Sequence, residues 1–285
     1  MKRKNIMILL AILLFLASLS LILYPLIATR YNESHQSQIF NDYEKIVESQ
    51  DNAEKERILE LARSYNEALQ PGVQDAFSQD LLLWASEDYA DQLDITGTGV
   101  MGYVQIPKLS VNLPILHGTS TATLEKGVGH LLGSSLPVGG AGTHAVLTGH
   151  SGMADKKMFS DLTDMQVGDI FFLSILGEKL AYQVEEINVV LPYETDLLEI
   201  VPSEDYCTLV TCTPFAVNTH RLLVRGTRIE YTAEKEEEIQ TLLDTPIKSN
   251  WEQQYLKGLC IGILVVTIFG TVCWSVWLFR RKRHG

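Results

Sequence analysis

Three short segments of the chain collect the side chains that are able to do acyl-transfer chemistry. In each of them, the functional residue lies at one end of a predicted strand or closely beyond it. A rigid strand end presents a side chain to solvent, so His150, Cys212 and Arg221 are candidates for one site. The segments are Leu147-Thr148-Gly149-His150-Ser151-Gly152, Thr208-Leu209-Val210-Thr211-Cys212 and Asn218-Thr219-His220-Arg221.

Cys212 is the candidate nucleophile, because a thiolate attacks carbonyl carbon atoms. Arg221 follows nine residues later, beyond Pro214, at a spacing that suits a strand returning antiparallel beside the cysteine strand. A cation there favours the thiolate, and its guanidinium is able to stabilise the oxyanion of an acyl-transfer intermediate. His150 would protonate a leaving amine and accept a proton from an incoming one. The competing interpretation is a buried structural thiol, the commoner role of a lone cysteine in an apolar strand.

The positions of the four cysteines argue against a disulfide. Cys260 and Cys273 lie in a long apolar run near the C-terminus. Cys207 and Cys212 lie five residues apart on one predicted strand, about 16 Å when extended, which is beyond the reach of a disulfide. Because Cys207 alternates to the other face of that strand, we expect it to pack in the core and leave Cys212 as the reactive thiol.

The remaining histidines do not suggest a metal centre. A zinc site needs three or four converging ligands, and no spacing of His and Cys in the sequence supplies such a set. We expect His130 and His144 to be structural hydrogen-bonding residues. Neither a metal nor any other cofactor is predicted.

Short apolar segments separated by glycine and proline are predicted strands. At close spacing and without strand-helix alternation, they predict a mainly β fold that closes or partly closes into a barrel. Helices are expected before them over 39–70, interrupted at 49–52, because apolar residues recur every three or four positions. A loop at 73–98 follows, and a charged helix is expected at 233–243. The predicted strands are Val100–Ile106, Leu113–His117, Ala145–Thr148, Ile170–Leu176, Leu180–Val190, Cys207–Cys212 and Arg221–Tyr231.

Two uncharged runs, Ile6–Ile27 and Gly258–Phe279, contain 22 residues each. At about 1.5 Å per residue, each is long enough to cross the roughly 30 Å core of a bilayer. Basic residues precede the first run and follow the second. The positive-inside rule therefore predicts two transmembrane helices, with both termini in the cytoplasm and residues 28–257 outside. A cleaved signal peptide is the alternative for the first run, although that run exceeds the usual apolar core and no clean cleavage site follows it.

The net charge of −12 arises from 23 basic and 35 acidic residues. Seven of the basic residues lie in the two predicted cytoplasmic ends and every acidic residue lies between the predicted spans, so the outer portion carries a net charge of −19. Such a charge argues against nucleic-acid binding, which needs a clustered basic surface. It favours solubility and substrates with exposed lysine.

The cysteine strand resembles a family signature. Thr208-Leu209-Val210-Thr211-Cys212 is similar to the sortase motif Thr-Leu-x-Thr-Cys, with Arg221 at the spacing of that family and His150 in its Thr-Gly-His segment. The resemblance covers about residues 40–231, and it implies a sortase-like closed β-barrel and a cysteine transpeptidase that uses these three residues. Further segments that carry it are Gly102-Tyr103-Val104-Gln105-Ile106-Pro107, Leu113-Pro114-Ile115, Gly127-Val128-Gly129-His130 and Ser135-Leu136-Pro137-Val138-Gly139-Gly140.

The stretch 213–226 is similar to the pilin-polymerising sortases, class C. That class tends to have two membrane segments and an N-terminal lid loop, in which an Asp-Pro-aromatic tripeptide covers the active site. Asp75-Ala76-Phe77 occupies the corresponding place, with Ala76 where proline is usual. The resemblance implies that Asp75 pairs with Arg221 and that Phe77 lies over Cys212. Without the fixed φ of proline, we expect either a looser lid or a different lid geometry.

The resemblance also implies a substrate and a location. The substrate is a pilin subunit with a Leu-Pro-x-Thr-Gly-like (LPXTG-like) sorting signal, cleaved between Thr and Gly to give a thioacyl enzyme on Cys212. The implied acceptor is a lysine amine of another pilin subunit, outside the membrane of a Gram-positive cell. Two alternatives stay open: a sortase that anchors proteins to the cell wall, and a non-catalytic membrane-tethered scaffold for pilus assembly.

The sequence therefore predicts five regions in chain order. They are a basic cytoplasmic end with an N-terminal anchor at 1–27, an extracytoplasmic helical region with the lid at 28–98, the catalytic β-barrel at 99–232, a juxtamembrane segment at 233–257, and a C-terminal transmembrane helix with a basic tail at 258–285.

Overall fold

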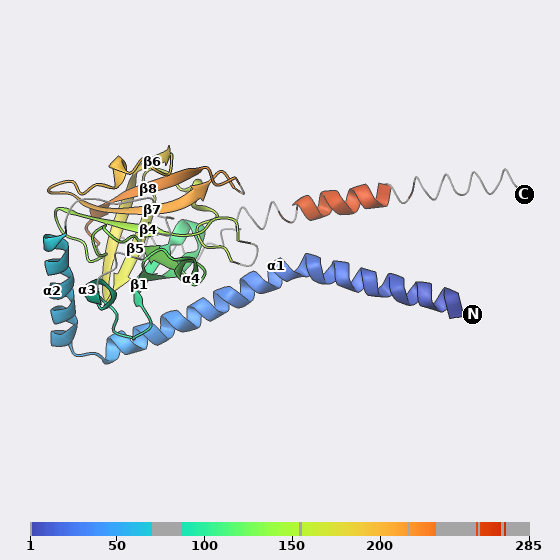
Figure 1. Ribbon diagram of the computed structural model, residues 1–285, viewed down its shortest axis with the longest axis horizontal. Helices are drawn as coiled ribbons and strands as arrows, with labels where there is room; N and C mark the ends of the chain where they lie inside the picture. Colours follow the sequence, from blue (N-terminus) through green and yellow to red (C-terminus); the bar gives the residue numbers. More distant parts are fainter. Residues whose placement is uncertain are drawn as a thin grey trace, which may run out of the picture. The chain divides into compact units, whose positions relative to one another are not determined.

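The computed structural model describes residues 2–69, 87–153, 156–215, 217–231, 255, 257–268 and 271. The chain divides into two units, Met1–Thr245 and Pro246–Gly285. The first unit contains a β-barrel together with the helices that precede it (Figure 1). The described residues of the second unit are helical.

Eight strands close into a barrel in the order β1-β2-β3-β4-β7-β8-β6-β5, which confirms the predicted barrel. Neighbouring strands are antiparallel except for two parallel pairs, β2 with β3 and β4 with β7. The parallel β4–β7 pair matters most for the site, because it brings the C-terminal ends of both strands to one edge. The strands are β1 (Val100–Ile106), β2 (Val111–His117), β3 (Val128–His130), β4 (Thr143–Thr148), β5 (Ile170–Ile175), β6 (Glu178–Val190), β7 (Asp205–Thr213) and β8 (His220–Ile229).

Every predicted strand corresponds to an observed one, with ends that differ by two residues at most. The strand that the sequence did not predict is β3, Val128–His130. It has three residues, one of them glycine, so neither its length nor its composition stands out from the surrounding loop. Its pairing with β2 and β4 makes it part of the closed barrel.

Helices and short turns surround the barrel. The predicted interruption at 49–52 is confirmed, because α1 ends at Ser49 and α2 begins at Asn52. The predicted charged helix at 233–243 lies outside the described residues. The helices are α1 (Lys2–Ser49), α2 (Asn52–Ala68), α3 (Glu87–Ala90) and α4 (Thr121–Leu124), with 3-10 turns η2 (Pro107–Leu109), η3 (Leu162–Asp164) and η4 (Asp196–Leu198).

Helix α2 is fixed to the barrel by an apolar stripe and one polar clamp. Leu59 and Ala62, three positions apart, are buried in the main core, as expected for one face of an amphipathic helix. At the end of the helix, Asn66 donates a hydrogen bond from Nδ2 to the Leu136 carbonyl at 3.1 Å and accepts one at Oδ1 from the Leu136 N–H at 2.7 Å. These two hydrogen bonds attach the C-terminal turn of α2 to the main chain at Leu136.

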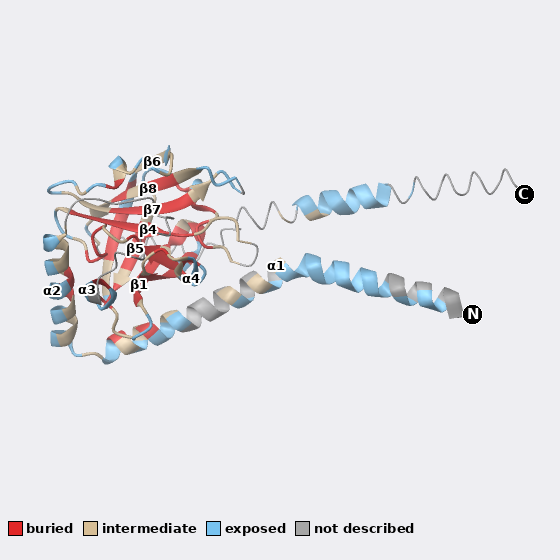
Figure 2. Cartoon of the chain, viewed as in Figure 1, coloured by how far each residue is buried: buried red, intermediate tan, exposed pale blue. Residues whose placement is uncertain are grey.

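The barrel interior forms the main hydrophobic core, and the strands are mostly buried (Figure 2). Cys207 lies in this core with no exposed surface, as predicted, and burial raises the pKa of its thiol well above the ordinary value. A second cluster lies on the other face of the β4–β7–β8 sheet. It contains Leu131, Val146, Leu198, Val210 and Leu223.

The first half of α1 carries exposed apolar side chains, among them Leu9, Phe15 and Leu21 (Figure 2). Within the part of the chain that the structure describes, no helix is both long enough and apolar enough to cross a membrane. The two transmembrane helices therefore stay predictions.

Candidate active site

The fold brings His150, Cys212 and Arg221 to one end of the barrel. In the parallel pairing of β4 and β7, Thr148 lies opposite Val210, so both strands run toward the same end of the barrel. His150 comes two residues after β4 ends, and Cys212 is the penultimate residue of β7. In the antiparallel pairing of β7 and β8, Cys212 lies opposite Arg221, the hairpin that the nine-residue spacing predicts. All three side chains are half-buried, which leaves them accessible.

The turn that carries His150 is bonded to the cysteine strand at three successive positions. The Gly149 N–H donates to the Val210 carbonyl at 3.0 Å. The Thr211 hydroxyl donates to the Gly149 carbonyl at 2.7 Å. The Ser151 hydroxyl donates to the Cys212 carbonyl at 2.8 Å. These bonds fix the histidine turn relative to Cys212, and the sequence interpretation assigned no role to Thr211 or Ser151.

Glycine is required on both sides of His150. A Cβ at Gly149 would lie 2.6 Å from a ring carbon of Phe159, and one at Gly152 would lie 2.7 Å from a ring carbon of Phe215. Gly152 also has φ +75°, a conformation that favours glycine. The Phe215 ring, on the β7–β8 loop, therefore packs close to the backbone of the histidine turn. This contact packs the β7–β8 loop against the turn that carries His150.

The β7–β8 loop orients Arg221. The Pro214 carbonyl accepts hydrogen bonds from the N–H groups of Val217 at 3.1 Å and Asn218 at 3.0 Å. Asn218 has φ 58°, which asparagine tolerates better than most residues. The Arg221 Nη1 group donates to the carbonyls of Asn218 and His220, both at 3.3 Å. Main-chain oxygens thus hold the guanidinium at the strand start, opposite Cys212.

The environment of His150 favours its neutral form. Partial burial lowers the pKa of His150 below 6.5, and the negative charge of Glu125 opposes this change. A histidine with a lowered pKa is the stronger acid when it is protonated. His150 therefore suits proton donation to a leaving amine.

Alternation along the strands separates the site face from the core face. Cys207 and Leu209 lie in the barrel core, whereas Val210 lies in the second cluster, on the same face as Cys212. On β4, Val146 lies in that second cluster, so Thr148 faces the same way. The Thr148 hydroxyl is buried, and no described group hydrogen-bonds to it. An unsatisfied buried hydroxyl is costly, and this one lies beside the Cys212 face of the sheet.

Two histidines of the barrel are structural, as expected. His130 is fully buried, with Nε2 2.8 Å from the Ser135 carbonyl oxygen and Nδ1 2.9 Å from the Tyr89 hydroxyl. His144 is buried between the Glu199 carbonyl and the Thr208 hydroxyl, at 2.8 and 2.7 Å. Burial lowers the pKa of each to about 4, so both are neutral at pH 7. The predicted lid residues, Asp75 and Phe77, lie outside the described residues.

A closed β-barrel with a cysteine and an arginine on paired strands, and a histidine beside them, is the arrangement of a cysteine transpeptidase. A sequence model of the sortase domain matches residues 104–229. The chain is 44% identical to sortase C-1 from Streptococcus pneumoniae, with a TM-score of 0.65 over 68% of this chain and 100% of that one. The chain therefore belongs to the sortase family, and its structural neighbours include class C sortases.

Other relatives agree with this assignment. Sortase C1 from Streptococcus agalactiae is 40% identical, with a TM-score of 0.63 over 69% of this chain and 97% of that chain. Among curated proteins, sortase A from Streptococcus agalactiae is 31% identical over 139 residues, which are 47% of this chain and 55% of that protein. Sortase D from Bacillus subtilis is 28% identical over 131 residues, 45% of this chain and 63% of that protein. The chain thus spans less than two thirds of these curated relatives.

Proposed function

We propose that this chain is a membrane-anchored pilin transpeptidase. The observation that carries the proposal is the register of β7 and β8, which places Cys212 opposite Arg221. The hydrogen bonds between 149–151 and the cysteine strand support it, because they hold His150 beside the same end of the barrel. A thiol, a fixed cation and an acid-base group are the parts that an acyl-transfer site needs.

The proposed reaction has two acyl transfers. The Cys212 thiolate attacks the carbonyl carbon of Thr in an LPXTG-like signal, and Arg221 stabilises the oxyanion. The Thr–Gly bond breaks, His150 gives its proton to the leaving amine, and a thioester remains on Cys212. A lysine amine of a second pilin subunit then attacks the thioester and loses a proton to His150. The C–S bond breaks, an isopeptide bond forms, and the thiolate returns.

Pilin is proposed as the substrate because of the structural neighbours. One Streptococcus pneumoniae sortase C structure, 42% identical to this chain, is described in terms of pilin substrate specificity. Another structural neighbour, 39% identical to this chain, is described as sortase C1 of GBS pilus island 1. The acidic outer portion of this chain suits an acceptor that presents lysine.

A lid and a membrane anchor complete the proposal. We place Asp75 against Arg221 and Phe77 over Cys212, so that water is kept from the thioester. The exposed apolar side chains in the first half of α1, together with the uncharged run Gly258–Phe279, support two transmembrane helices with the barrel outside the cell.

The test is to incubate the full-length protein with candidate pilins and to map the linkage formed by mass spectrometry. We expect an isopeptide bond from the signal Thr to a pilin lysine, and neither product nor thioacyl adduct with Cys212→Ala. A link to a peptidoglycan amine instead would indicate a cell-wall-anchoring sortase. Product formation by Cys212→Ala would refute the assignment of the nucleophile.

A further inference from the structure

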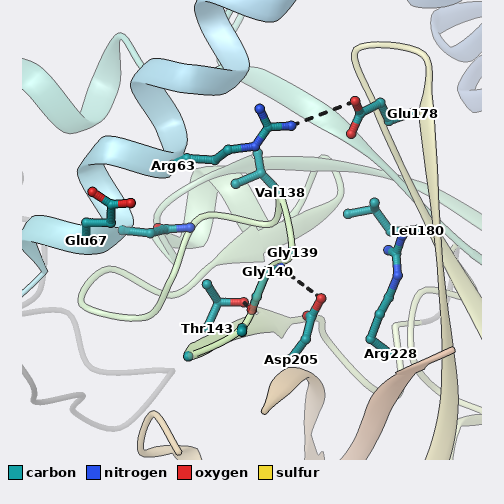
Figure 3. Close-up of a pocket in the computed structure, with 13 residues that line it drawn as sticks. Arg63, Glu67, Val138, Gly139, Gly140, Thr143, Glu178, Leu180, Asp205 and Arg228 are labelled. Atoms are coloured by element: carbon teal, nitrogen blue, oxygen red, sulfur yellow. Dashed lines mark hydrogen bonds and ion pairs between the residues drawn. The ribbon is translucent and has the colours of Figure 1, made fainter. Parts of the chain in front are cut away.

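Figure 3 shows a polar cavity lined by Thr143 and Asp205. These residues begin β4 and β7, so the cavity lies at the end of the barrel opposite Cys212. Its volume is 560 Å³, within the roughly 300–1,000 Å³ range of small-ligand sites. Its walls are formed by the end of α2, the glycine-rich segment 138–142, the first residues of β4, β6 and β7, and Arg228 near the end of β8. Asp205 at this cavity and Cys212 are seven residues apart on β7, about 23 Å in an extended strand. A ligand here would not touch the acyl-transfer site.

Several polar groups of the cavity are already bonded within the protein. The Asp205 carboxylate accepts one hydrogen bond on each oxygen, from the Tyr182 hydroxyl at 2.9 Å and the Gly140 N–H at 2.8 Å. The Thr143 hydroxyl donates to the Gly140 carbonyl at 2.7 Å. These bonds order the walls and leave other groups to meet a ligand.

Arg228 is the cavity group whose bonding is incomplete. It lies opposite Tyr182 in the β6–β8 pairing, with the guanidinium carbon 5.7 Å from the centre of that ring. Its Nη1 atom is buried, and no group in the described ranges accepts a hydrogen bond from it. A buried charged donor without an acceptor is unfavourable. The Arg228 side chain lines the cavity, and a carboxylate matches the planar donors of a guanidinium, so an anionic ligand group in the cavity would pair with its charge.

The acidic side chains around the cavity limit what that ligand is. Glu67, Glu178 and Asp205 line it together with Arg63 and Arg228, so the lining carries a net charge of −1 and disfavours a multiply charged anion such as phosphate. Glu178 is near Arg63, at 3.9 Å, whereas Glu67 is exposed at the α2 end. Figure 3 shows Glu67 and Arg228 on opposite sides of the cavity. One wall thus attracts a cation and the opposite wall an anion.

We propose that this cavity binds a short zwitterionic peptide, with its carboxylate on Arg228 and its amine on Glu67. The volume accommodates a few residues, and the glycine-rich segment lines the space between the two charged walls. The site is independent of the chemistry at Cys212, so it stands or falls separately from the proposed function.

The test uses isothermal titration calorimetry of the full-length protein in detergent, with trialanine as the probe. We expect saturable binding, weakened at least ten-fold when the peptide is trialanine amide, which lacks the carboxylate, or N-acetyl-trialanine, which lacks the amine. Arg228→Gln and Glu67→Gln should weaken trialanine binding to a similar degree. The control Glu60→Gln, on an exposed position of α2 two turns before Glu67, should bind as the unmodified chain does.

Two results would overturn the proposal. One is the absence of saturable heat with trialanine at millimolar concentration. The other is equal affinity for trialanine and its blocked forms, a comparison that needs no variant and so does not depend on whether Arg228→Gln folds. Circular dichroism of each variant would show that a loss of binding is not a loss of structure.

Discussion

The Ser151 hydroxyl donates a hydrogen bond to the main-chain carbonyl of Cys212 at 2.8 Å. Ser151 directly follows the candidate proton donor, and Cys212 is the candidate nucleophile, so this one bond joins the two halves of the site. It links residues 61 positions apart in the chain. We therefore regard Ser151 as a positioning residue for His150.

Ser151→Ala should lower kcat without a comparable change in KM. A net hydrogen bond contributes about 1 kcal/mol, which corresponds to roughly a five-fold change in rate if it is lost at the transition state. Steady-state kinetics with a fluorogenic sorting-signal peptide would measure this. Ser151→Thr keeps the hydroxyl and should restore most of kcat. If Ala and Thr variants were equally slow, packing rather than the hydrogen bond would account for the effect.

Arg221→Lys should lower kcat by about 100-fold, the loss typical of an oxyanion donor. Lysine keeps the positive charge but cannot present the planar donors that the Asn218 and His220 carbonyls orient. The control is Arg225→Lys, four positions further along β8, where the guanidinium pairs with Glu185. Near-normal kcat in Arg221→Lys would mean that charge alone suffices, and would remove the oxyanion role.

The sequence predicted the barrel and the residues of the site for different physical reasons. Strands such as Val100–Ile106 stand out because most of their residues are apolar and glycine or proline flanks them. The Cys212–Arg221 pairing followed from a short connection, which forces an antiparallel return. These are local properties of the chain.

Contacts between distant segments were not predictable in the same way. The Ser151–Cys212 bond depends on the parallel pairing of β4 and β7, which no local pattern encodes. The buried Thr148 hydroxyl is recognisable only once the faces of the sheet are known. The Asn66 clamp on Leu136 likewise joins positions 70 residues apart.

Phe77→Ala should increase the rate at which a small thiol reagent labels Cys212, because the proposed lid would no longer cover it. Peptide mass spectrometry would assign the adduct, and Cys207, which is fully buried, should stay unlabelled in both proteins. Phe77→Tyr keeps an aromatic ring and is the matched control. Identical labelling rates for Phe77→Ala and the unmodified chain would show that this segment is not the cover.

Glu125→Gln should lower the pKa of His150 further. Burial already places this pKa below 6.5, and Glu125 is the charge that raises it. Removing that charge disfavours the imidazolium, so His150 loses its proton at a lower pH than in the unmodified chain. The falling, alkaline limb of the pH–activity profile therefore shifts to lower pH. NMR titration of the His150 ring would measure the midpoint, with Glu60→Gln as an exposed control. An unchanged midpoint would contradict the electrostatic effect of Glu125.

The barrel should lose stability as the pH falls from about 6.5 toward 4, because His130 and His144 are buried in neutral form. Their pKa values are about 4 in the folded chain, against 6.5 ordinarily. As the pH falls below 6.5, these histidines take up protons in the unfolded chain but not yet in the folded one. The stabilisation that is complete above pH 6.5 is therefore lost between pH 6.5 and 4. Shifts of this size correspond to about 3 kcal/mol for each histidine.

Urea unfolding followed by near-ultraviolet circular dichroism, at pH 7.5, 5.5 and 4.5, would measure the loss. His144→Gln keeps an amide near the Glu199 carbonyl and the Thr208 hydroxyl but cannot titrate. It should be less stable than the unmodified chain at pH 7.5, yet lose less stability on acidification. Because every carboxylate is common to both proteins, the difference between their slopes isolates the histidine. Parallel slopes would mean that His144 takes up its proton equally in the folded and unfolded states, contrary to its burial.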